Sequence, residues 1–205
     1  MNLYDRYMLP PILDFVMRQD QLQEYRQAVL AAASGRVLEI GVGSGLNFSF
    51  YRKEADTVIG LDPSPRLLAV AQRRAVAADV RAIFVQASAT AIPLADNAVD
   101  TIVMTWTLCS IPDPLTALRE MRRVLKPGGM LLFVEHGLSP ELGVERWQHW
   151  LTPIWRRIAG GCHLDRKMDN LVRDAGFELS QIRTKYARGP RAFTYMYQGC
   201  ARPRS

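Results

Sequence analysis

Glu39-Ile40-Gly41-Val42-Gly43-Ser44-Gly45 is the stretch that decides the fold of this chain, and it continues a short apolar run that ends at Ile40. Such a run is typical of a buried β-strand. Glycines directly after a strand let the backbone turn tightly and let a ligand approach without a Cβ in the way. The spacing is GxGxG, and Leu46 stands where the dinucleotide-binding fingerprint requires glycine. The loop alone therefore leaves three interpretations open: a dinucleotide site, a nucleoside site and a plain tight turn.

Apolar runs and amphipathic stretches alternate along the rest of the chain. Short apolar runs predict seven strands, over residues 36–40, 57–61, 81–86, 100–105, 130–135, 177–184 and 192–200. Helical spacing and first-turn prolines predict helices over residues 11–32, 46–54, 65–78, 114–126, 141–158 (interrupted near Pro153) and 165–175. Strands that are apolar throughout and alternate with helices indicate a mostly parallel sheet. The sequence therefore predicts an α/β fold with a doubly wound, Rossmann-like sheet and helices on both faces.

Composition and cysteine content restrict the class of protein. Of the 205 residues, 48% are hydrophobic and 22% are charged, as in a globular protein with its own core. We expect one domain over residues 1–205, with a helical cap at 1–32 and a lid-like helical insertion at 141–170. The three cysteines form no CxxC pair, which argues against a disulfide framework and favours a reducing, cytoplasmic setting.

The net charge of +6 is unevenly distributed. Residues 1–115 carry 10 basic and 12 acidic side chains, a net −2, whereas residues 116–205 carry 16 and 8, a net +8. A basic half is compatible with nucleic acid, anionic lipid, an anionic small molecule or an ordinary solvated surface. The first residues, MNLYDRYMLPPILDFVM, lack the basic start and unbroken apolar core of a signal peptide. No run reaches the ~18 apolar residues of a membrane span.

In a parallel sheet, ligands bind beyond the carboxyl ends of the strands, so the residues directly after each strand form the candidate site. Asp62 ends the second strand, where a carboxylate can accept hydrogen bonds from both hydroxyls of a ribose or can cap the next helix. Ala87 and Ser88 follow the third strand, where a backbone N–H and a short polar side chain can read a purine. These loops predict a nucleoside-binding edge.

Two further motifs follow along the chain: IPLADNAVD at residues 92–100 and LKPGGMLLFVE at residues 125–135. Together with the glycine loop and the aspartate after the second strand, they resemble the class I S-adenosylmethionine-dependent methyltransferases over about residues 36–135. Within that class the chain is similar to the alkyl thiol S-methyltransferases, and the similarity extends to about residue 170. The motifs that carry it are Asn47-Phe48, Tyr51, Leu108-Cys109-Ser110, residues 122–129, Glu135-His136, Trp147-Gln148, residues 153–155 and Gly161-Cys162.

The resemblance implies S-adenosylmethionine as the cofactor and a last strand antiparallel to the others. It also implies the cofactor-binding residues: Glu39, Gly41, Gly43 and Gly45 for the methionine part, Asp62 for the ribose, Ala87 and Ser88 for the adenine, and Thr105 with Trp106 near the sulfonium. The chain departs from many relatives, which have aspartate where Ser88 stands. It also departs from the mammalian members, whose hydrophobic N-terminal anchor is replaced here by a short, proline-broken apolar segment, so membrane residence is not carried over.

Transfer of a methyl group to sulfur needs a thiolate, because a thiol with a pKa of ~8.5 is a poor nucleophile. His136, directly after the fifth strand, is the predicted catalytic residue, since an imidazole can act as a base near neutral pH. A hydrogen-bonded structural role is its alternative. Cys162, His163 and His149 fit no standard zinc spacing, so no metal is expected. Cys109 is expected to be a small buried hydrophobe.

The sequence leaves more than one class of methyl acceptor open. A small hydrophobic molecule with a thiol sulfur is the first prediction, and a phospholipid head group or another amphiphilic amine is the alternative acceptor. A non-catalytic, cofactor-binding regulator is the alternative from another class. Trp147, Trp150 and Trp155, and likewise Tyr4 and Tyr7, either pack within the fold or cover the pocket. The N-terminal segment can instead touch a membrane surface. No base-flipping motif of the Asn-Pro-Pro-Tyr type is present, so no nucleic-acid substrate is expected.

Overall fold

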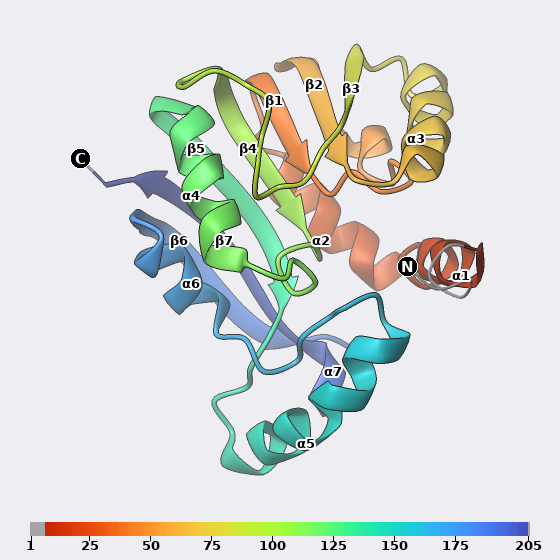
Figure 1. The fold of residues 1–205 in the computed structure, drawn as a ribbon, viewed down its shortest axis with the longest axis vertical. Coiled ribbons are helices and arrows are strands. Elements are labelled where there is room, and N and C mark those ends of the chain that lie inside the picture. Colours follow the sequence, from red (N-terminus) through yellow and green to blue (C-terminus); the bar gives the residue numbers. More distant parts are fainter. Residues whose placement is uncertain (1–6, 205) are drawn as a thin grey trace.

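A seven-stranded sheet with the order β3-β2-β1-β4-β5-β7-β6 forms the centre of the computed structural model, which describes residues 7–204 (Figure 1). The strands are β1 (Gly35–Ile40), β2 (Ala55–Asp62), β3 (Ala82–Gln86), β4 (Val99–Thr105), β5 (Leu125–His136), β6 (Phe177–Tyr186) and β7 (Tyr195–Pro203). Neighbouring strands are parallel from β3 to β5, and β7 is antiparallel to both β5 and β6. The predicted fold class is confirmed, including the antiparallel last strand.

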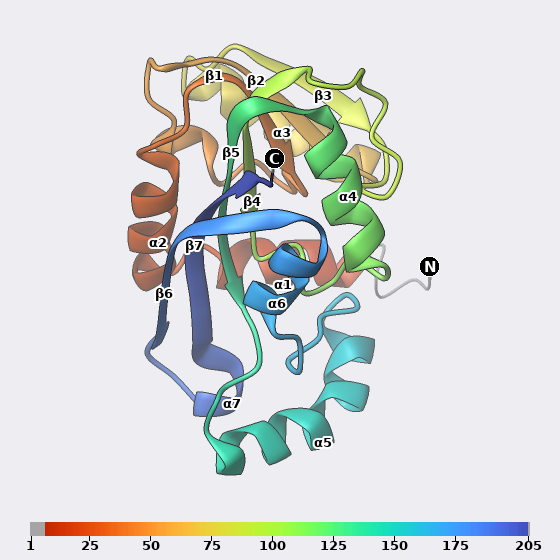
Figure 2. The ribbon, with the colours of Figure 1, turned by 90° about the vertical axis from the view of Figure 1, so that its left-hand side faces the viewer.

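Helices cover both faces of the sheet, as the edge-on view in Figure 2 shows. The helices are α1 (Leu9–Val16), α2 (Asp20–Leu30), α3 (Pro65–Ala77), α4 (Pro114–Val124), α5 (Leu142–Ile158), α6 (Met168–Asp174) and α7 (Arg191–Thr194), and η2 (Phe48–Phe50) is a 3₁₀ turn. Buried side chains of α2 and α3 pack on one face of the sheet, and those of α4 and α6 pack on the other. Helix α5 lies beyond the edge toward which the arrowheads of β1, β4 and β5 point (Figure 1).

The central strands are apolar throughout because both of their faces are covered. In β4, Ile102 and Met104 belong to the core under α4 and α6, whereas Val103 belongs to the core under α2 and α3. All three side chains are fully buried. Alternate residues of one strand therefore serve two separate cores, which explains the continuous apolar run in the sequence.

The single N-terminal helix predicted over residues 11–32 is wrong, because the chain forms two helices there. Helix α1 ends at Val16 and α2 begins at Asp20, and the backbone of Gln19 between them is extended (φ −56°, ψ 139°). Helix α2 packs its apolar side on the sheet, whereas Phe15 of α1 is 79% exposed. The break lets α1 leave the sheet and lie against the glycine loop, to which Asp14 is hydrogen-bonded through Ser44.

Several other boundaries also differ from the prediction. The helix predicted at 46–54 is only the short η2 turn, because Asn47 and Tyr51 turn their side chains into buried hydrogen bonds. Helix α5 continues through Pro153 without the predicted interruption. Strand β5 begins as early as Leu125. The last strand begins only at Tyr195, because the four residues before it form α7.

Candidate active site

The glycine loop after β1 turns sharply over the end of the sheet. Gly41, Gly43 and Gly45 have φ angles of +65°, +54° and +81°, a region that glycine adopts freely. A Cβ on Gly41 would lie 2.4 Å from the Thr107 side chain, so this position has no room for a larger residue. A Cβ on Gly43 would meet no atom nearer than 3.8 Å. The backbone at Gly43 is therefore open to a ligand, whereas Gly41 is closed in by the loop after β4.

Asp62, at the end of β2, joins the glycine loop to the start of α3. Its Oδ2 accepts a hydrogen bond from the Gly43 N–H at 3.0 Å, and its Oδ1 accepts one from the Ser64 N–H at 2.8 Å. Burial raises the pKa of this carboxyl above its ordinary value, against the lowering effect of the two N–H donors. Each carboxylate oxygen keeps a lone pair for a further donor. Asp62 does not cap α3, since Ser64 takes that place by accepting a hydrogen bond from the Leu67 N–H, and the role of Asp62 toward a ribose stays a prediction.

Glu39 is buried at the end of β1 and holds a hydrogen-bond network together. Its Oε1 accepts a hydrogen bond from Asn47 Nδ2 at 2.9 Å, and its Oε2 accepts one from the Tyr51 hydroxyl at 2.7 Å. Burial raises the pKa of Glu39 to about 7, although both donors and the nearby Arg26 guanidinium lower it. Glu39 therefore orders the segment after the glycine loop through both of its oxygens.

Arg26 extends this network from the opposite side and was not predicted as a site residue from the sequence. Its Nη1 donates to Asn47 Oδ1 at 2.7 Å and to Thr105 Oγ1 at 3.4 Å, and its guanidinium lies 4.8 Å from the centre of the Trp106 ring. Asn47 Nδ2 also donates to Thr105 Oγ1, at 3.1 Å. Burial lowers the pKa of Arg26 to about 10, against the raising effect of Glu39. The signal in the sequence was a lone arginine on the apolar side of a helix, between Leu22 and Val29.

Buried polar atoms without a partner gather near this edge of the sheet. Among the described residues they are the Tyr25 hydroxyl, Trp106 Nε1 and His136 Nδ1. The rings of Tyr25 and Trp106 pack edge to face, 6.4 Å apart. Trp106 also has a φ of +50°, which is unusual for a residue with a large side chain. A buried polar group without a hydrogen bond is costly, so these three atoms distinguish this edge of the sheet from the rest of the described interior.

Ala87 and Ser88 follow β3, which lies beside β2 at the edge of the sheet. Ser88 Oγ is 2.7 Å from Thr90 Oγ1 and accepts a hydrogen bond from the Thr90 N–H at 3.2 Å. Ser88 is exposed and Ala87 is partly buried. The loop is thus closed by a local serine–threonine contact and lies one strand beyond Asp62.

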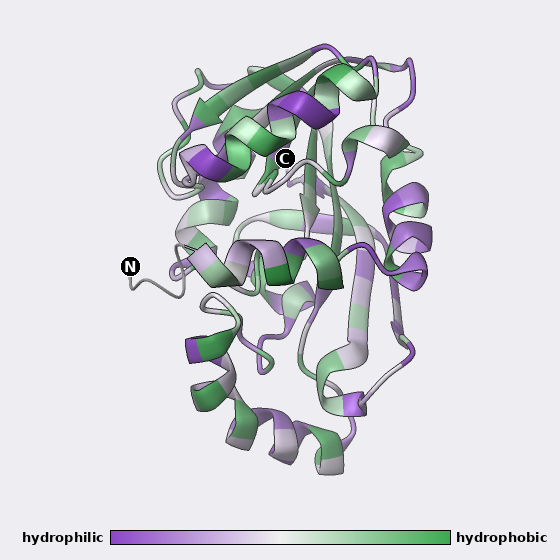
Figure 3. Ribbon diagram, turned by 90° about the vertical axis from the view of Figure 1, so that its right-hand side faces the viewer, coloured by the Kyte–Doolittle hydropathy of each residue, from purple (hydrophilic) through white to green (hydrophobic). Residues whose placement is uncertain are grey.

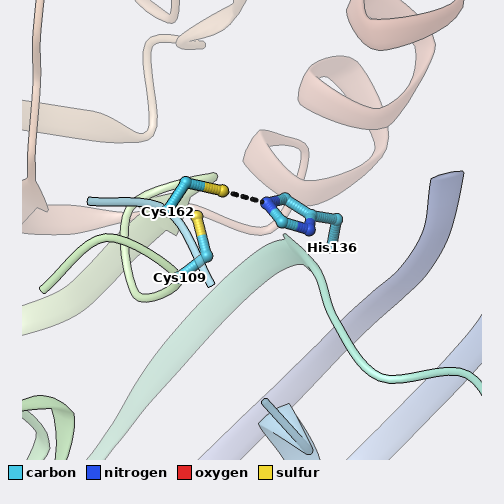
Figure 4. A group of neighbouring side chains, drawn as sticks. All are labelled: Cys109, His136 and Cys162. Carbon is cyan, nitrogen blue, oxygen red and sulfur yellow. Dashed lines mark hydrogen bonds between the residues drawn. The ribbon is translucent and has the colours of Figure 1, made fainter. Parts of the chain in front are cut away.

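His136 ends β5 and lies against two cysteines (Figure 4). Its Nε2 is 2.8 Å from Cys162 Sγ, which also accepts a hydrogen bond from Trp155 Nε1 at 3.3 Å. Ligand atoms of His136, Cys162 and Cys109 all lie within 4.8 Å of one another. Burial disfavours the imidazolium, but Cys162 and Glu135 raise the pKa of His136 above its ordinary value. Contact with Cys109 and with His136 lowers the pKa of Cys162.

The grouping of Cys162 with His149 and His163 that the sequence analysis considered does not form. His149 Nδ1 and His163 Nδ1 both lie near Asp165, at 3.6 and 3.3 Å from its carboxylate oxygens. Cys162 turns instead toward His136 and toward Cys109, which is buried as expected. The thiol groups therefore belong to the end of the sheet and not to the histidines of α5 and its loop.

Glu135 holds the loop that carries Cys109, a role that the sequence analysis did not identify. This fully buried carboxylate accepts hydrogen bonds from three consecutive backbone N–H groups, those of Thr107 at 2.6 Å, Leu108 at 2.9 Å and Cys109 at 3.4 Å. Burial raises the pKa of Glu135 to about 7, although these donors lower it. Arg166 supports the same loop by donating to the carbonyl of Leu108 at 2.6 Å.

The helices expected to cover the site have exposed apolar side chains. On α5, Trp147 and Trp150 are 60% and 63% exposed. Tyr7, just before α1, is half exposed, with the Arg66 guanidinium 4.8 Å from its ring centre. Tyr4 lies outside the described residues. Figure 3 shows hydrophobic segments on both α1 and α5. Within residues 7–204, no helix combines the length and the apolar composition that crossing a membrane requires.

Comparison with known proteins identifies related chains. A family model described as a methyltransferase domain matches residues 38–133. Thiol S-methyltransferase TMT1B from Rattus norvegicus is 36% identical over 153 residues, which cover 71% of this chain and 61% of the relative. Thiol S-methyltransferase TMT1A from Homo sapiens is 33% identical over 178 residues, which cover 82% of this chain and 68% of the relative. The solved structure of N-methyltransferase NodS from Bradyrhizobium japonicum WM9, in complex with S-adenosyl-L-homocysteine, matches with a TM-score of 0.73 at 17% identity, over 98% of this chain and 95% of NodS.

These similarities carry different weight. The likeness to NodS, at 17% identity, shows a shared fold. The aligned residues span 61% and 68% of the length of the two curated relatives. The human relative is nevertheless 33% identical over most of this chain, and the family model matches from within β1 to within β5. The chain therefore belongs to the family of S-adenosylmethionine-dependent methyltransferases that includes the thiol S-methyltransferases TMT1A and TMT1B.

Proposed function

We propose that this chain transfers a methyl group from S-adenosylmethionine to a small hydrophobic acceptor, with a thiol sulfur as the first choice. The observation that carries the proposal is a convergence at one edge of the sheet. There, Asp62, Glu39 and His136 lie at the carboxyl ends of β2, β1 and β5, respectively. Asp62 binds the Gly43 N–H, and Glu39 binds Asn47. S-adenosylmethionine supplies an activated methyl group on a positively charged sulfur, so the protein has to supply position and electrostatics.

The residues present fit this cofactor. The open backbone at Gly43 admits a ligand, and Asp62 keeps acceptors for ribose hydroxyls. The unpartnered Trp106 Nε1 and Tyr25 hydroxyl offer polar groups beside Thr105. We assign the adenine to the loop at Ala87 and Ser88, the ribose to Asp62, and the methionine part to the glycine loop. Glu39 supports the methionine part by ordering Asn47 and Tyr51.

His136 belongs to the acceptor side of this proposal. Strand β5 lies next to β4, and Val134 of β5 pairs with Thr105, the last residue of β4. His136 comes two residues after Val134 and therefore lies beyond the end of β4. We propose that His136 keeps the acceptor sulfur in its thiolate form, which is the reactive form of a thiol. The relatives named as thiol S-methyltransferases support a thiol as the first acceptor to test.

The first experiment measures S-adenosylhomocysteine release with a small alkyl thiol, for the unchanged chain and for Asp62→Ala. We expect thiol-dependent release from the unchanged chain and a loss of cofactor affinity of roughly tenfold or more in the variant, because charge-assisted hydrogen bonds to a ribose are removed. Asp56→Ala is the matched control, since Asp56 is exposed at the opposite end of the same strand. Unchanged affinity in Asp62→Ala would refute the ribose assignment, and cofactor binding without turnover would favour a regulator.

A second acceptor class, an amine-headed phospholipid, is favoured by the exposed apolar surfaces. Trp147 and Trp150 on α5 and Phe15 on α1 are each at least 60% exposed, and Arg146 flanks the tryptophans. A peripheral membrane contact through these helices would bring such a lipid to the site. An amine-headed lipid is therefore the parallel arm of the release assay, with salt-sensitive co-sedimentation on anionic vesicles as its readout. A cytoplasmic location and the absence of a nucleic-acid substrate stay predictions.

A further inference from the structure

Two thiols and one imidazole converge at the end of β5, from three separate parts of the chain. Cys109 comes from the loop after β4, His136 from the last position of β5, and Cys162 from the loop after α5. Their ligand atoms lie within 4.8 Å of one another, and each residue is less than 10% exposed. Figure 4 shows both sulfur atoms and the imidazole directed toward a common point. A buried group of two sulfurs and one nitrogen is a donor set that Zn²⁺ prefers.

The surroundings of this group resemble those of metal ligands. Trp155 Nε1 donates a hydrogen bond to Cys162 Sγ at 3.3 Å, the kind of outer contact that orients a thiolate ligand. The Cys109 loop is fixed by three N–H groups bound to Glu135, and the backbone N–H of His163 donates to the Cys109 carbonyl at 2.8 Å. His136 Nδ1 is buried without a partner. Two ligands are thus held in place before any metal binds. The imidazole nitrogen that faces the sulfurs is Nε2, 2.8 Å from Cys162 Sγ, so a metal ion would replace that hydrogen bond.

We infer that Cys109, His136 and Cys162 form a Zn²⁺ site whose fourth position takes the sulfur of the acceptor. A set of two cysteines and one histidine with an open fourth position is an arrangement found in catalytic zinc sites. The position is right for this role, because β5 lies beside β4, whose last residue, Thr105, belongs to the proposed cofactor edge. This inference rests on the proposed function, and it assigns His136 a ligand role through which the thiolate is stabilised.

The reaction balances with the groups that the inference names. On binding Zn²⁺, the acceptor thiol gives its proton to the water or hydroxide that it displaces from the fourth position. A lone pair of the acceptor thiolate then forms the new bond to the methyl carbon. The bond between that carbon and the cofactor sulfur breaks, and its electron pair stays on the sulfur of S-adenosylhomocysteine. The product is a neutral thioether, a weaker ligand than a thiolate, which leaves the metal.

The direct test is metal binding by the reduced, metal-free chain of 205 residues, with Co²⁺ as a spectroscopic probe and Zn²⁺ as its competitor. We expect one Co²⁺ per chain, a thiolate-to-cobalt charge-transfer band, and displacement by Zn²⁺. Cys109→Ser, Cys162→Ser and His136→Asn should each weaken metal affinity by roughly tenfold or more. Cys200→Ser is the matched control, since this half-buried thiol on β7 is not part of the group. Absence of the band, or an equal loss in Cys200→Ser, would overturn the inference.

A second measurement separates the metal site from the cofactor site. Addition of an alkyl thiol to the Co²⁺-loaded chain should change its absorption, because the thiol sulfur enters the fourth position. An unchanged spectrum with cobalt bound would refute that part of the inference. Cofactor affinity should be the same in the metal-free chain and in the three variants, which also shows that they are folded. If cofactor binding and thiol methylation persist without metal, only the zinc inference fails, and if cofactor binding itself is absent, the proposed function fails.

Cys109 and Cys162 could form a disulfide by oxidation instead of binding a metal ion. A titration of free thiols in the freshly purified chain should find Cys109 and Cys162 both reduced and both protected by Zn²⁺ against alkylation. A disulfide between them that persists under mild reduction would leave no thiolate ligands and would overturn the metal assignment. His136→Asn discriminates further, because it removes a metal ligand and leaves both thiols in place.

Discussion

At the scale of single residues, Glu39 shows how a site group can work against stability. Its carboxyl is fully enclosed, and burial raises its pKa to about 7 in the folded chain, against an ordinary value of 4.5. A raised folded-state pKa means that the folded chain favours the protonated form. The stabilising contribution of Glu39 is therefore complete below about pH 4.5 and is lost as the pH rises through about 7.

We accordingly predict that Glu39→Gln stabilises the protein at pH 8, by roughly 1–3 kcal/mol, and has little effect at pH 4.5. The amide keeps the shape of the side chain and removes the buried charge. Denaturant unfolding of both proteins at the two pH values is the measurement. The same variant should bind S-adenosylmethionine more weakly, because Tyr51 and Asn47 lose their charged acceptor. A variant that is less stable at pH 8 would show that the charge of Glu39 is fully compensated by Arg26.

Some residues of the candidate site could be predicted from the sequence, and others could not. The positions of Gly43 after β1 and of Asp62 at the end of β2 were predicted from the sequence, because short local patterns set the backbone there, and their cofactor roles stay predictions. Arg26 was missed, since its partners Asn47 and Thr105 are 21 and 79 residues away. Ser88 lies where the sequence placed it, but its observed partner is Thr90 in the same loop. The place of a site residue can be predicted from the sequence when its hydrogen-bond partners are close to it in the chain.

At the scale of elements, α1 is held to the glycine loop by Asp14. The carboxylate accepts hydrogen bonds from Arg74 Nη1 and Nη2 at 2.7 and 3.1 Å, and from the Ser44 hydroxyl. Burial alone would raise the pKa of Asp14, but Arg74, Ser44 and Arg18 together hold it well below its usual range. A lowered folded-state pKa contributes stability above the ordinary value near 3.8, and this contribution is lost as the pH falls through the folded value.

We predict that Asp14→Asn loosens α1 and costs roughly 1–2 kcal/mol of local stability, because partly buried, charge-assisted hydrogen bonds are lost. Hydrogen exchange of the amides at residues 12–16 should quicken at pH 7. Cofactor affinity should fall several-fold, since Ser44 lies in the glycine loop that we assign to the cofactor. Asp20→Asn is the control, because Asp20 is exposed in the first turn of the neighbouring helix α2. Equal exchange rates in the two variants would show that packing, not Asp14, holds α1.

At the scale of the whole molecule, the proposed cofactor contacts lie at the ends of three strands, so a bound cofactor should stabilise the whole fold. A ligand at 100 times its Kd stabilises a protein by about 2.7 kcal/mol. For a chain of this size, each kcal/mol raises the Tm by roughly 2–4 °C. We therefore predict that S-adenosylmethionine at that concentration raises the Tm by about 5–10 °C.

Differential scanning calorimetry of the reduced chain, with and without cofactor, is the check on this shift. Asp62→Ala at the same cofactor concentration should show about half of the shift or less, because its affinity is lower by roughly tenfold or more. A full shift in this variant would mean that the ribose contact contributes little. If the cofactor slowed hydrogen exchange near the site but left the Tm unchanged, the prediction that cofactor binding stabilises the whole fold would be wrong.

The sequence by itself determined the seven strands in chain order, the doubly wound sheet, and the places of the glycine loop and Asp62 at the strand ends. Those features follow from periodicity and from short motifs, which act through the local backbone. Only the tertiary structure decided the break between α1 and α2, the Arg26–Asn47–Thr105 network, and the meeting of Cys109, His136 and Cys162. Of these three residues, His136 and Cys162 are 26 positions apart in the sequence. No local pattern encodes such a contact, because it exists only after adjacent strands have brought their carboxyl ends to one edge and a distant loop has packed against them.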